Sequence, residues 1–255
     1  PLSFAEYYSV VGGEKQLAGK NYYTFGGLPQ LLTLKSEQKK ISFLQSLQTR
    51  VYIKDLVERN RIIATKEFSE LLCVIASSIG SSVNPTKLSN TIKSIKNINL
   101  SPKTISTYLE HICYAFLAER ALRFDVKGKK YISTLSKYYF QDIGIRNSLL
   151  NFRQLEETHI MENIIYNELL IRGYSVDIGV VVDRRKGSYS QKEIDFVVNK
   201  GDKRVYIQSA WQMNTTEKIN AELDSLKLAK DFFFNLIIQN DIPSHFTDDD
   251  GIIHC

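Results

Sequence analysis

Cysteine is scarce in this chain, with three residues among 255. They stand at Cys73, Cys113 and Cys255 without any Cys-x-x-Cys spacing, so the sequence predicts neither a disulfide framework nor a zinc site. No apolar run reaches the roughly 18–20 residues that a membrane span needs, and no secretory signal opens the chain. A phosphate-binding loop, GxxxxGK followed by serine or threonine, is also missing. These absences predict a protein of the reducing cytoplasm, with no membrane segment and no ATPase activity of the P-loop kind in this chain.

Charge is unevenly distributed along a chain of otherwise ordinary composition, with 43% hydrophobic and 24% charged residues. Residues 1–65 hold 9 basic and 5 acidic side chains, residues 66–146 hold 12 and 6, and residues 147–255 hold 12 and 17. The formal net charge of +5 therefore conceals a basic middle and an acidic end. If nucleic acid is bound, the middle is the better candidate. We predict three domains with these boundaries.

Residues 1–65 are predicted to form a helical segment. A short helix starts after Ser3, a suitable N-cap, and runs through Val10. An aromatic stretch at residues 22–29 is interrupted by a Gly-Gly-x-Pro turn. A long helix from about Ser36 to Asn60 carries apolar residues at helical spacing.

Residues 66–146 show three helices followed by a hairpin, which is the order of a winged helix-turn-helix domain. The predicted elements are helices at Glu67–Ile79, Pro85–Ile95 and from Ser101, and strands at Ala121–Val126 and Lys137–Phe140. Pro85 and Pro102 suit the first turn of their helices, and Ser101 suits an N-cap.

In the winged-helix arrangement the start of the third helix enters the major groove and the hairpin turn meets phosphates. The nucleic-acid-binding candidates are Lys103, Thr104, Ser106 and Thr107 on the helix, and Lys127, Lys129 and Lys130 at the turn. The third helix carries no arginine for bidentate guanine readout. A winged helix that serves as a protein-interaction module or spacer stays an open alternative.

Residues 147–255 are predicted to follow the order α-β-β-β-α-β, after a connecting segment at Asp142–Phe152. The elements are a helix at Glu156–Arg172 ended by Gly173, strands at Tyr174–Val182, Ile194–Val198 and Val205–Ser209, a helix at Thr216–Lys230 and a strand at Phe232–Ile238. An irregular acidic tail follows from Ile242. This is the core order of the restriction-endonuclease-like α/β fold. The expected fold class is thus a multi-domain α+β protein.

The strands around Asp195 and Gln208 resemble the metal site of PD-(D/E)xK nucleases, where an acid and a second oxygen ligand on neighbouring strands hold Mg²⁺. Ala210 stands where the lysine of that motif is expected, and a lysine is needed to position or activate the attacking water. Glu162 and Glu168 are candidate additional ligands. They lie six residues apart, about 240° around a helix, so both cannot face one metal.

Three alternatives follow for Asp195: a structural carboxylate in an inactive scaffold, a hydrolytic centre, or a site that binds metal or ligand without cleavage. The absent lysine and the net negative charge of residues 147–255 favour the inactive scaffold. Mg²⁺ at Asp195 is therefore a minor expectation.

The segments together resemble the C-terminal portion of bacterial and archaeal AAA+-type ATPases, a part described as a domain of unknown function. The resemblance covers nearly the whole chain and rests on Leu2–Phe4, Phe25–Pro29, Tyr52–Arg59, Ser101–Leu109, Phe124–Lys130, Lys137–Phe140, Asp142–Asn147, Glu162–Tyr166, Glu193–Val197 and Tyr206–Gln208. In that family the lysine after the tyrosine-isoleucine-glutamine ending is also missing, as at Ala210.

The resemblance implies an upstream ATPase core that binds ATP and Mg²⁺, with residues 1–65 as part of its helical lid. It also implies that the sequence is a fragment of a longer protein. The expected function is a non-catalytic region that recognises DNA or a protein partner. A divalent-metal-dependent nuclease and a pure protein-interaction module are the alternatives, and the sequence predicts no particular oligomeric state.

Overall fold

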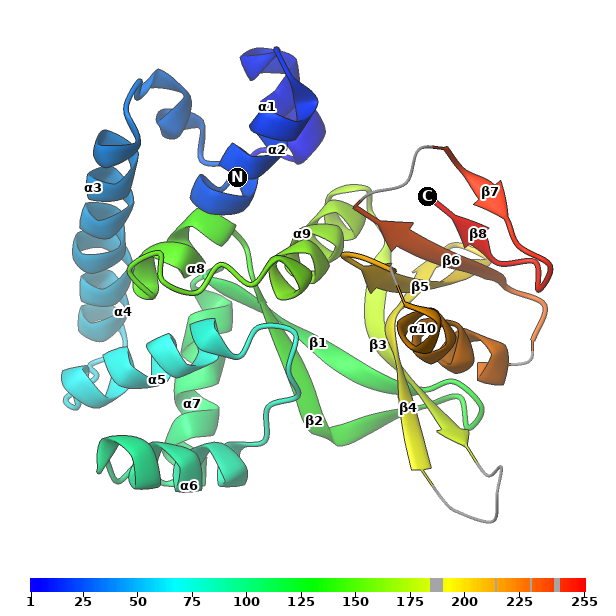
Figure 1. Ribbon diagram of the computed structural model, residues 1–255. Coiled ribbons are helices and arrows are strands. Elements are labelled where there is room, and N and C mark those ends of the chain that lie inside the picture. The colour runs from blue at the N-terminus through cyan, green and yellow to red at the C-terminus, as the bar shows by residue number, and fades with distance from the viewer. Residues whose placement is uncertain (184–189, 214, 230, 241–243) are drawn as a thin grey trace. The chain divides into compact units, whose positions relative to one another are not determined.

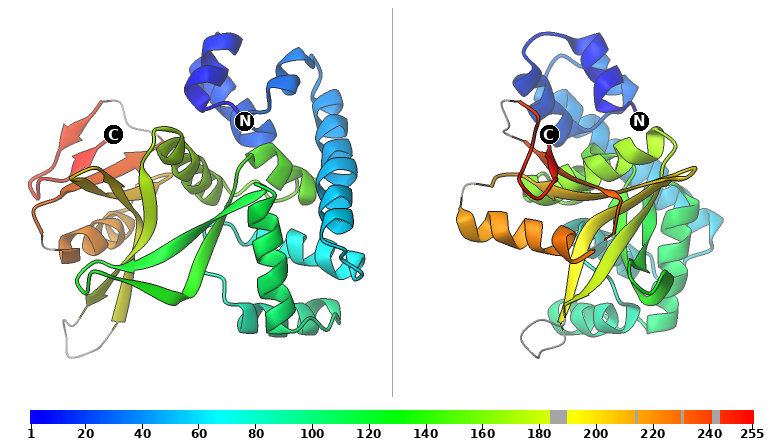
Figure 2. Two further views of the ribbon diagram at one scale, coloured as in Figure 1. Left: turned by 180° about the vertical axis from the view of Figure 1, so that it is seen from behind. Right: turned by 90° about the vertical axis from the view of Figure 1, so that its right-hand side faces the viewer.

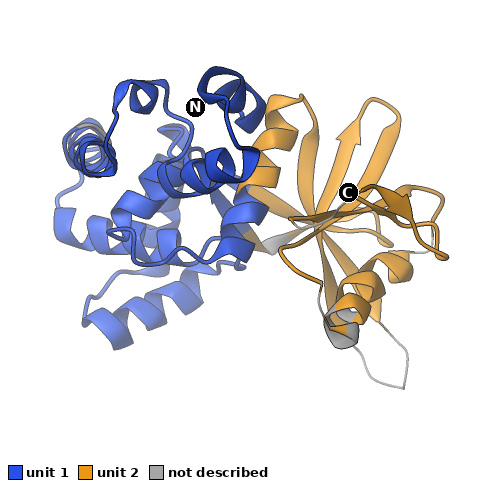
Figure 3. Ribbon diagram, turned by 45° about the horizontal axis from the view of Figure 1, so that its top comes forward, with its two compact units in different colours: residues 1–120, 137–163 blue, residues 121–136, 164–255 orange. Residues whose placement is uncertain are grey.

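The computed structural model describes all residues except 184–189, 214, 230 and 241–243 (Figure 1). Its contacts divide the chain into two compact units (Figure 3). Unit 1 comprises residues 1–120 and 137–163, and unit 2 comprises residues 121–136 and 164–255. These boundaries differ from the three predicted domains, which stay a prediction. No helix within the described residues is long and apolar enough to cross a membrane.

Unit 1 is mainly helical. Its helices are α1 (Phe4–Val11), α2 (Lys15–Phe25), η1 (Pro29–Thr33), α3 (Glu37–Leu47), η2 (Gln48–Ile53), α4 (Lys54–Arg59), α5 (Thr65–Ser77), α6 (Pro85–Lys96), α7 (Pro102–Tyr114) and α8 (Ile143–Leu149). The long helix predicted at residues 36–60 consists of three pieces, because a π-helical turn, η2, separates α3 from α4.

Local capping explains where several of these helices begin. The Ser3 hydroxyl accepts the N–H of Glu6, and the Glu6 carboxylate accepts the N–H of Ser3, so α1 starts with a complete capping box. Asn84 and Ser101 cap α6 and α7, and a proline occupies the first position of each helix. The caps that were predicted at Ser3 and Ser101 are confirmed.

The segment predicted as a connection at Asp142–Phe152 is instead helix α8, and it is the most completely buried helix of unit 1. All seven of its residues are buried, including Arg146 with 1% of its surface exposed. The prediction was wrong because an all-round buried helix lacks the amphipathic periodicity that marks a surface helix.

Unit 2 contains most of a mixed eight-stranded sheet (Figure 2). The strands are β1 (Ala118–Asp125), β2 (Lys130–Phe140), β3 (Ser175–Asp183), β4 (Ser190–Lys200), β5 (Lys203–Ala210), β6 (Phe234–Gln239), β7 (Phe246–Thr247) and β8 (Ile253–His254), in the order β2-β1-β3-β4-β5-β6-β8-β7. The helices of this half of the chain are α9 (Glu157–Ile171) and α10 (Thr216–Ala229).

Pairing in the sheet agrees with the predicted order α-β-β-β-α-β from α9 to β6. Strands β3, β4 and β5 are successively antiparallel, and β6 joins β5 in parallel after the crossover through α10. Helix α10 contacts β3, β4 and β5, and its Leu226 is buried with Ile194, Val197 and Tyr206. The coarse prediction of an α+β protein, with a helical N-terminal half and a mixed sheet in the C-terminal half, is confirmed.

Two regions of the sheet depart from the sequence predictions. The hairpin predicted as the wing is longer, and β1 pairs in parallel with β3 at Arg123 and Ile178, so the hairpin continues the mixed sheet. The tail that was predicted to be irregular contributes β7 and β8, and Ile252 is buried in the core of unit 2. This pairing was not predicted because each strand has only two residues and the segment is rich in aspartate. Ile242, where the tail was predicted to begin, lies outside the described residues.

Candidate functional site

Asp195 and Gln208, the predicted metal-site pair, lie next to each other on β4 and β5. The Asp195 carboxylate accepts two hydrogen bonds at Oδ2, each 2.8 Å long, from the backbone N–H and the hydroxyl of Ser209. The Gln208 side chain accepts the backbone N–H of Asp195 at 3.2 Å and donates to the Glu222 carboxylate at 2.6 Å. This arrangement ties the two strands and α10 together by side-chain hydrogen bonds.

Ala210, in the place of the nuclease lysine, is 1% exposed and belongs to the apolar core of unit 2. Within the described part of the chain, no three His, Cys, Asp or Glu side chains are grouped so that they could hold a metal ion. The hydrogen bonds of Asp195 with Ser209 and Gln208 join β4 to β5.

Glu162 and Glu168, the additional ligand candidates, have cationic partners of their own. In unit 1 the Glu162 carboxylate receives the Lys137 ammonium at 2.8 Å and the Tyr139 hydroxyl at 2.5 Å. The Lys137 and Glu162 side chains are only 3% and 7% exposed. Glu168, in unit 2, forms an ion pair with Arg172 one helical turn away. The pair of Lys137 and Glu162 was not predicted from the sequence, because its partners are 25 residues apart.

The nucleic-acid-binding candidates of α7 lie near the N-terminal end of that helix in unit 1. Lys103 and Thr107 are exposed, and Thr104 and Ser106 are half-buried. The hydroxyls of Ser106 and Thr107 donate to backbone carbonyls one turn earlier, and Thr104 shares a hydrogen bond with the Ser101 hydroxyl. Lys103 is the charged member of this group.

Lys127, Lys129 and Lys130, here called the tip lysines, are exposed at the β1–β2 turn in unit 2. Gly128 donates its N–H to the Asp125 carboxylate at 2.8 Å, and Lys129 adopts a positive φ of 50°, so the turn is tight. Lys127 reaches the Val182 carbonyl at 3.5 Å. Among the described residues no ion pair joins Lys129 or Lys130 to a carboxylate. Three of the four residues 127–130 are thus exposed lysines.

Helix α8 organises a buried polar cluster in unit 1 that the sequence did not reveal as such. Asp142 accepts the N–H of Gly27 at 2.8 Å and the N–H of Ile145 at 3.0 Å. Asn147 donates to the carbonyls of Tyr23 and Thr24, both at 2.9 Å. Burial raises the pKa of the Asp142 carboxyl, and the backbone N–H groups lower it in part. The end of α2 is therefore fastened to α8 by side-chain hydrogen bonds.

Arg146 occupies the same cluster and connects α8 to two further segments. Its Nε donates to the Ala76 carbonyl of α5 at 2.7 Å, and its Nη1 donates to the Gln154 carbonyl and the Asn147 side chain. Nη2 lies 3.4 Å from the Glu156 carboxylate. Burial lowers the pKa of the guanidinium, and the hydrogen bond with Glu156 opposes that shift. With 1% of its surface exposed and its guanidinium bonded to these partners, Arg146 has no free face for a ligand.

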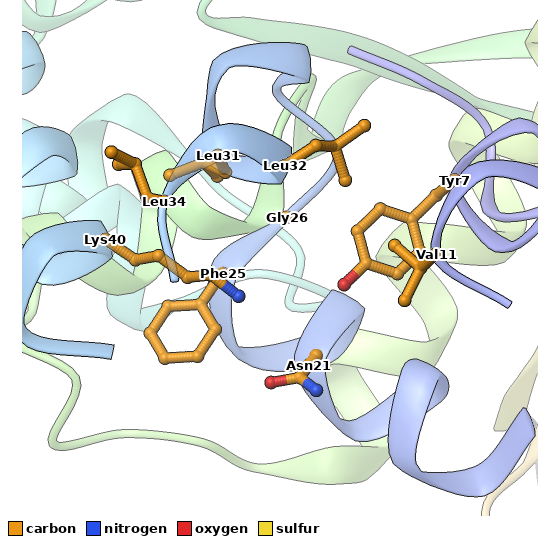
Figure 4. Close-up of a pocket in the computed structure, with 9 residues that line it drawn as sticks. All are labelled: Tyr7, Val11, Asn21, Phe25, Gly26, Leu31, Leu32, Leu34 and Lys40. Carbon is orange, nitrogen blue, oxygen red and sulfur yellow. The ribbon is translucent and has the colours of Figure 1, made fainter. Parts of the chain in front are cut away.

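A small cavity in unit 1 is lined mostly by apolar side chains (Figure 4). Its volume is about 150 Å³, below the roughly 300–1,000 Å³ of sites for drug-sized ligands. Phe25 and Lys40 lie on one side of it and Tyr7 and Val11 on the other, and the Lys40 ammonium is 5.1 Å from the centre of the Phe25 ring. The cavity has room for one apolar side chain or a similarly small group.

A family model described as "Domain of unknown function (DUF8612)" matches residues 18–156, which is just over half of the chain. The matched residues include α8 and its partners on α2. They also include both members of the β1–β2 hairpin and the tip lysines.

Two uncharacterized proteins are similar over most of the chain. One, from Haemophilus influenzae, is 32% identical over 243 residues, which cover 93% of this chain and 58% of that protein. The other, from Methanocaldococcus jannaschii, is 27% identical over 230 residues, which cover 86% of this chain and 50% of that protein. The chain therefore spans about half the length of the relatives it matches.

Proposed function

Because the chain belongs to the family described as Domain of unknown function (DUF8612), we propose its function from its own residues: it is a non-catalytic region that binds nucleic acid through the tip lysines. We propose that the β1–β2 turn acts as the wing of the winged helix predicted from the sequence, and that Lys103 on α7, in unit 1, is a separate phosphate contact. The observation that carries the proposal is the turn with three exposed lysines, Lys127, Lys129 and Lys130.

Charge and geometry support nucleic acid as the ligand. Phosphate contacts need exposed, flexible cations, and lysine supplies a charge that can reach a phosphate without a fixed angle. Residues 66–146 hold 12 basic and 6 acidic side chains, so the surrounding segment does not cancel the tip. Without an arginine on α7, contacts of this kind give little discrimination between base sequences.

The region around Asp195 supports a structural and not a hydrolytic role for the strand pair. Metal-dependent cleavage needs carboxylates that converge on a cation and a group that activates water. Here the Asp195 carboxylate receives two hydrogen bonds from Ser209, and Gln208 donates to Glu222. Ala210 cannot replace the missing lysine.

The resemblance to AAA+-type ATPases supports a second part of the proposal. In the intact protein an upstream ATPase core would bind ATP and Mg²⁺, and this region would transmit the resulting change to DNA or to a partner protein. A protein partner in place of DNA stays the alternative for the same surface.

The test of nucleic-acid binding replaces Lys127, Lys129 and Lys130 together by alanine. We expect weaker duplex binding and a salt dependence, log K against log salt concentration, that is shallower by up to about 3, since each lost phosphate contact reduces the slope by about 0.9. The matched control removes three exposed lysines of unit 1, at positions 15, 20 and 39, and leaves the slope unchanged. Equal binding by the tip variant and the native chain, or no binding at low salt, would refute the proposal.

Nuclease activity is tested separately. Native protein and Asp195→Ala are incubated with plasmid and with single-stranded DNA in Mg²⁺ and in Mn²⁺. We expect no cleavage that distinguishes the two proteins. Metal-dependent cleavage that disappears in the variant would establish the nuclease alternative.

A further inference from the structure

A row of aromatic rings and one arginine extends through unit 2, and the proposed function does not use it. The row consists of Tyr131, Phe124, Arg204, Phe233 and Tyr206 in that order of contact. The Arg204 guanidinium lies between two rings, 5.2 Å from the centre of Phe124 and 5.3 Å from the centre of Phe233. Tyr131 meets Phe124 edge-on at 5.5 Å, and Tyr206 meets Phe233 edge-on at 6.1 Å.

Hydrogen bonds orient three members of the row, Tyr131, Tyr206 and Arg204. The Tyr131 hydroxyl donates to Asp177 at 3.2 Å, and the Tyr206 hydroxyl donates to Asp231 at 2.5 Å. Arg204 donates through Nε to the Asn199 side chain at 2.8 Å. A ring that is already oriented loses little conformational entropy when a ligand stacks on it.

Two rings of the row reach the solvent. Tyr131, its first member, is 60% exposed, and Phe233 is 39% exposed, whereas Phe124 and Tyr206 are buried at 9% and 0%. Phe232 and Phe234, the sequence neighbours of Phe233, are 108% and 69% exposed. Exposed aromatic side chains gathered in this way mark a binding surface, because burying them against a ligand removes apolar area from water.

The charges near the row indicate which class of ligand it would bind. The tip lysines immediately precede Tyr131 in the chain, and Lys203 is exposed next to Arg204. Among the nearby carboxylates, Asp177 and Asp231 are already bonded to the row's own hydroxyls. Flat π-faces beside cations are complementary to nucleobases on a phosphate backbone.

We infer that the exposed rings of this row, Tyr131 and Phe233, stack unpaired bases of a single-stranded nucleic acid while the tip lysines meet its phosphates. The inference rests on the proposed function and adds the class of substrate. In a duplex each base face is already covered by its neighbours, so exposed rings favour a strand whose bases are free to splay out. Stacking does not depend on base identity, so the preference is for single strands and not for a sequence.

The experiment compares a labelled oligonucleotide, alone and annealed to its complement, by fluorescence anisotropy on the 255-residue chain. Tyr131→Leu and Phe233→Leu keep apolar volume and remove the ring. We expect each to weaken single-strand binding about tenfold, since one stacked base contributes roughly 1–3 kcal/mol, and to leave duplex binding within about twofold. Tyr131→Phe retains the ring and retains binding. Tyr114→Leu removes a 79% exposed ring of α7 in unit 1 and has no effect.

The possible outcomes bear on the inference and on the proposed function in different ways. Equal affinity of the native chain for both forms, or Leu variants that bind single strands normally, would overturn the inference while the lysine variant still tests the proposed function. No binding of either form would overturn both. Binding to phosphatidylserine vesicles but not to single strands, lost in the Leu variants, would assign the row to a membrane surface and overturn the inference. Far-UV circular dichroism and thermal melts confirm that each variant is folded.

Discussion

Replacement of Lys137 by methionine tests whether Glu162 is a structural residue or a ligand. Methionine preserves most of the volume of the lysine side chain and removes its charge. Of the Lys137 ammonium and the Tyr139 hydroxyl, which both donate to Glu162 Oε1, only the hydroxyl then remains. With side-chain exposures of 3% and 7%, water cannot replace the lost ammonium. Removing one partner of a buried ion pair costs about 3–5 kcal/mol, more than the net contribution of the pair.

The free energy of unfolding is measured by urea titration followed by far-UV circular dichroism, which reports on the helices of unit 1. For a chain of this size the expected loss corresponds to a fall in melting temperature of roughly 6–20 °C. The double variant Lys137→Met with Glu162→Gln removes the unpaired charge and should recover most of the lost stability. Lys54→Met is the control, since its ion pair with Glu58 is 67% and 66% exposed and contributes little.

Two results would refute this reasoning. The first is a Lys137→Met protein as stable as the native chain. The second is a Glu162→Gln protein that keeps its stability and loses a metal-dependent activity, which would make Glu162 a ligand.

Two further predictions concern backbone contact and pH. Gly144→Ala should destabilise unit 1 by about 3 kcal/mol or more in urea titrations, because the added Cβ would lie 1.8 Å from the Phe25 carbonyl oxygen. The control is Gly19→Ala, whose Cβ would have its nearest neighbour at 4.0 Å. This variant should be neutral or slightly stabilising. Burial raises the pKa of Asp177, with opposing contributions from Tyr131 and Arg204, so its contribution to stability is present below the ordinary pKa and is lost as pH rises through the raised value. Asp177→Asn should therefore gain in melting temperature relative to the native chain as pH rises above the ordinary aspartate pKa of about 3.9, and a difference that stays constant with pH would contradict the assignment.

Much of the local structure was predictable because its causes lie within a few residues. Ser3 and Ser101 have short side chains whose hydroxyl oxygens reach the backbone N–H three residues later, and both cap helices as expected. Gly173, with a φ of 76°, follows α9 at the predicted position. The β4–β5 hairpin forms around Gly201, and it brings Asp195 and Gln208 together as predicted.

The hydrogen-bond partners of Asp195 and Gln208 were not predictable from the sequence. Spacing along two strands places Asp195 beside Gln208, but it does not reveal that Ser209 would satisfy the carboxylate or that α10 would bring Glu222 to the glutamine. Glu162 was likewise predicted as a ligand because the sequence does not reveal which side chain binds its carboxylate. Its partner Lys137 belongs to a strand whose pairing depends on the whole sheet.

By itself, the sequence determined where most helices and strands begin, the α+β class, and the cationic turn that carries the proposed function. These follow from caps, prolines, glycines and apolar periodicity, whose energies are local. Only the tertiary structure decided that α8 is buried, that Lys137 neutralises Glu162, and that Tyr131, Arg204 and Phe233 form one row. Such contacts join residues that are tens of positions apart, and their existence depends on which elements pack together after each has formed.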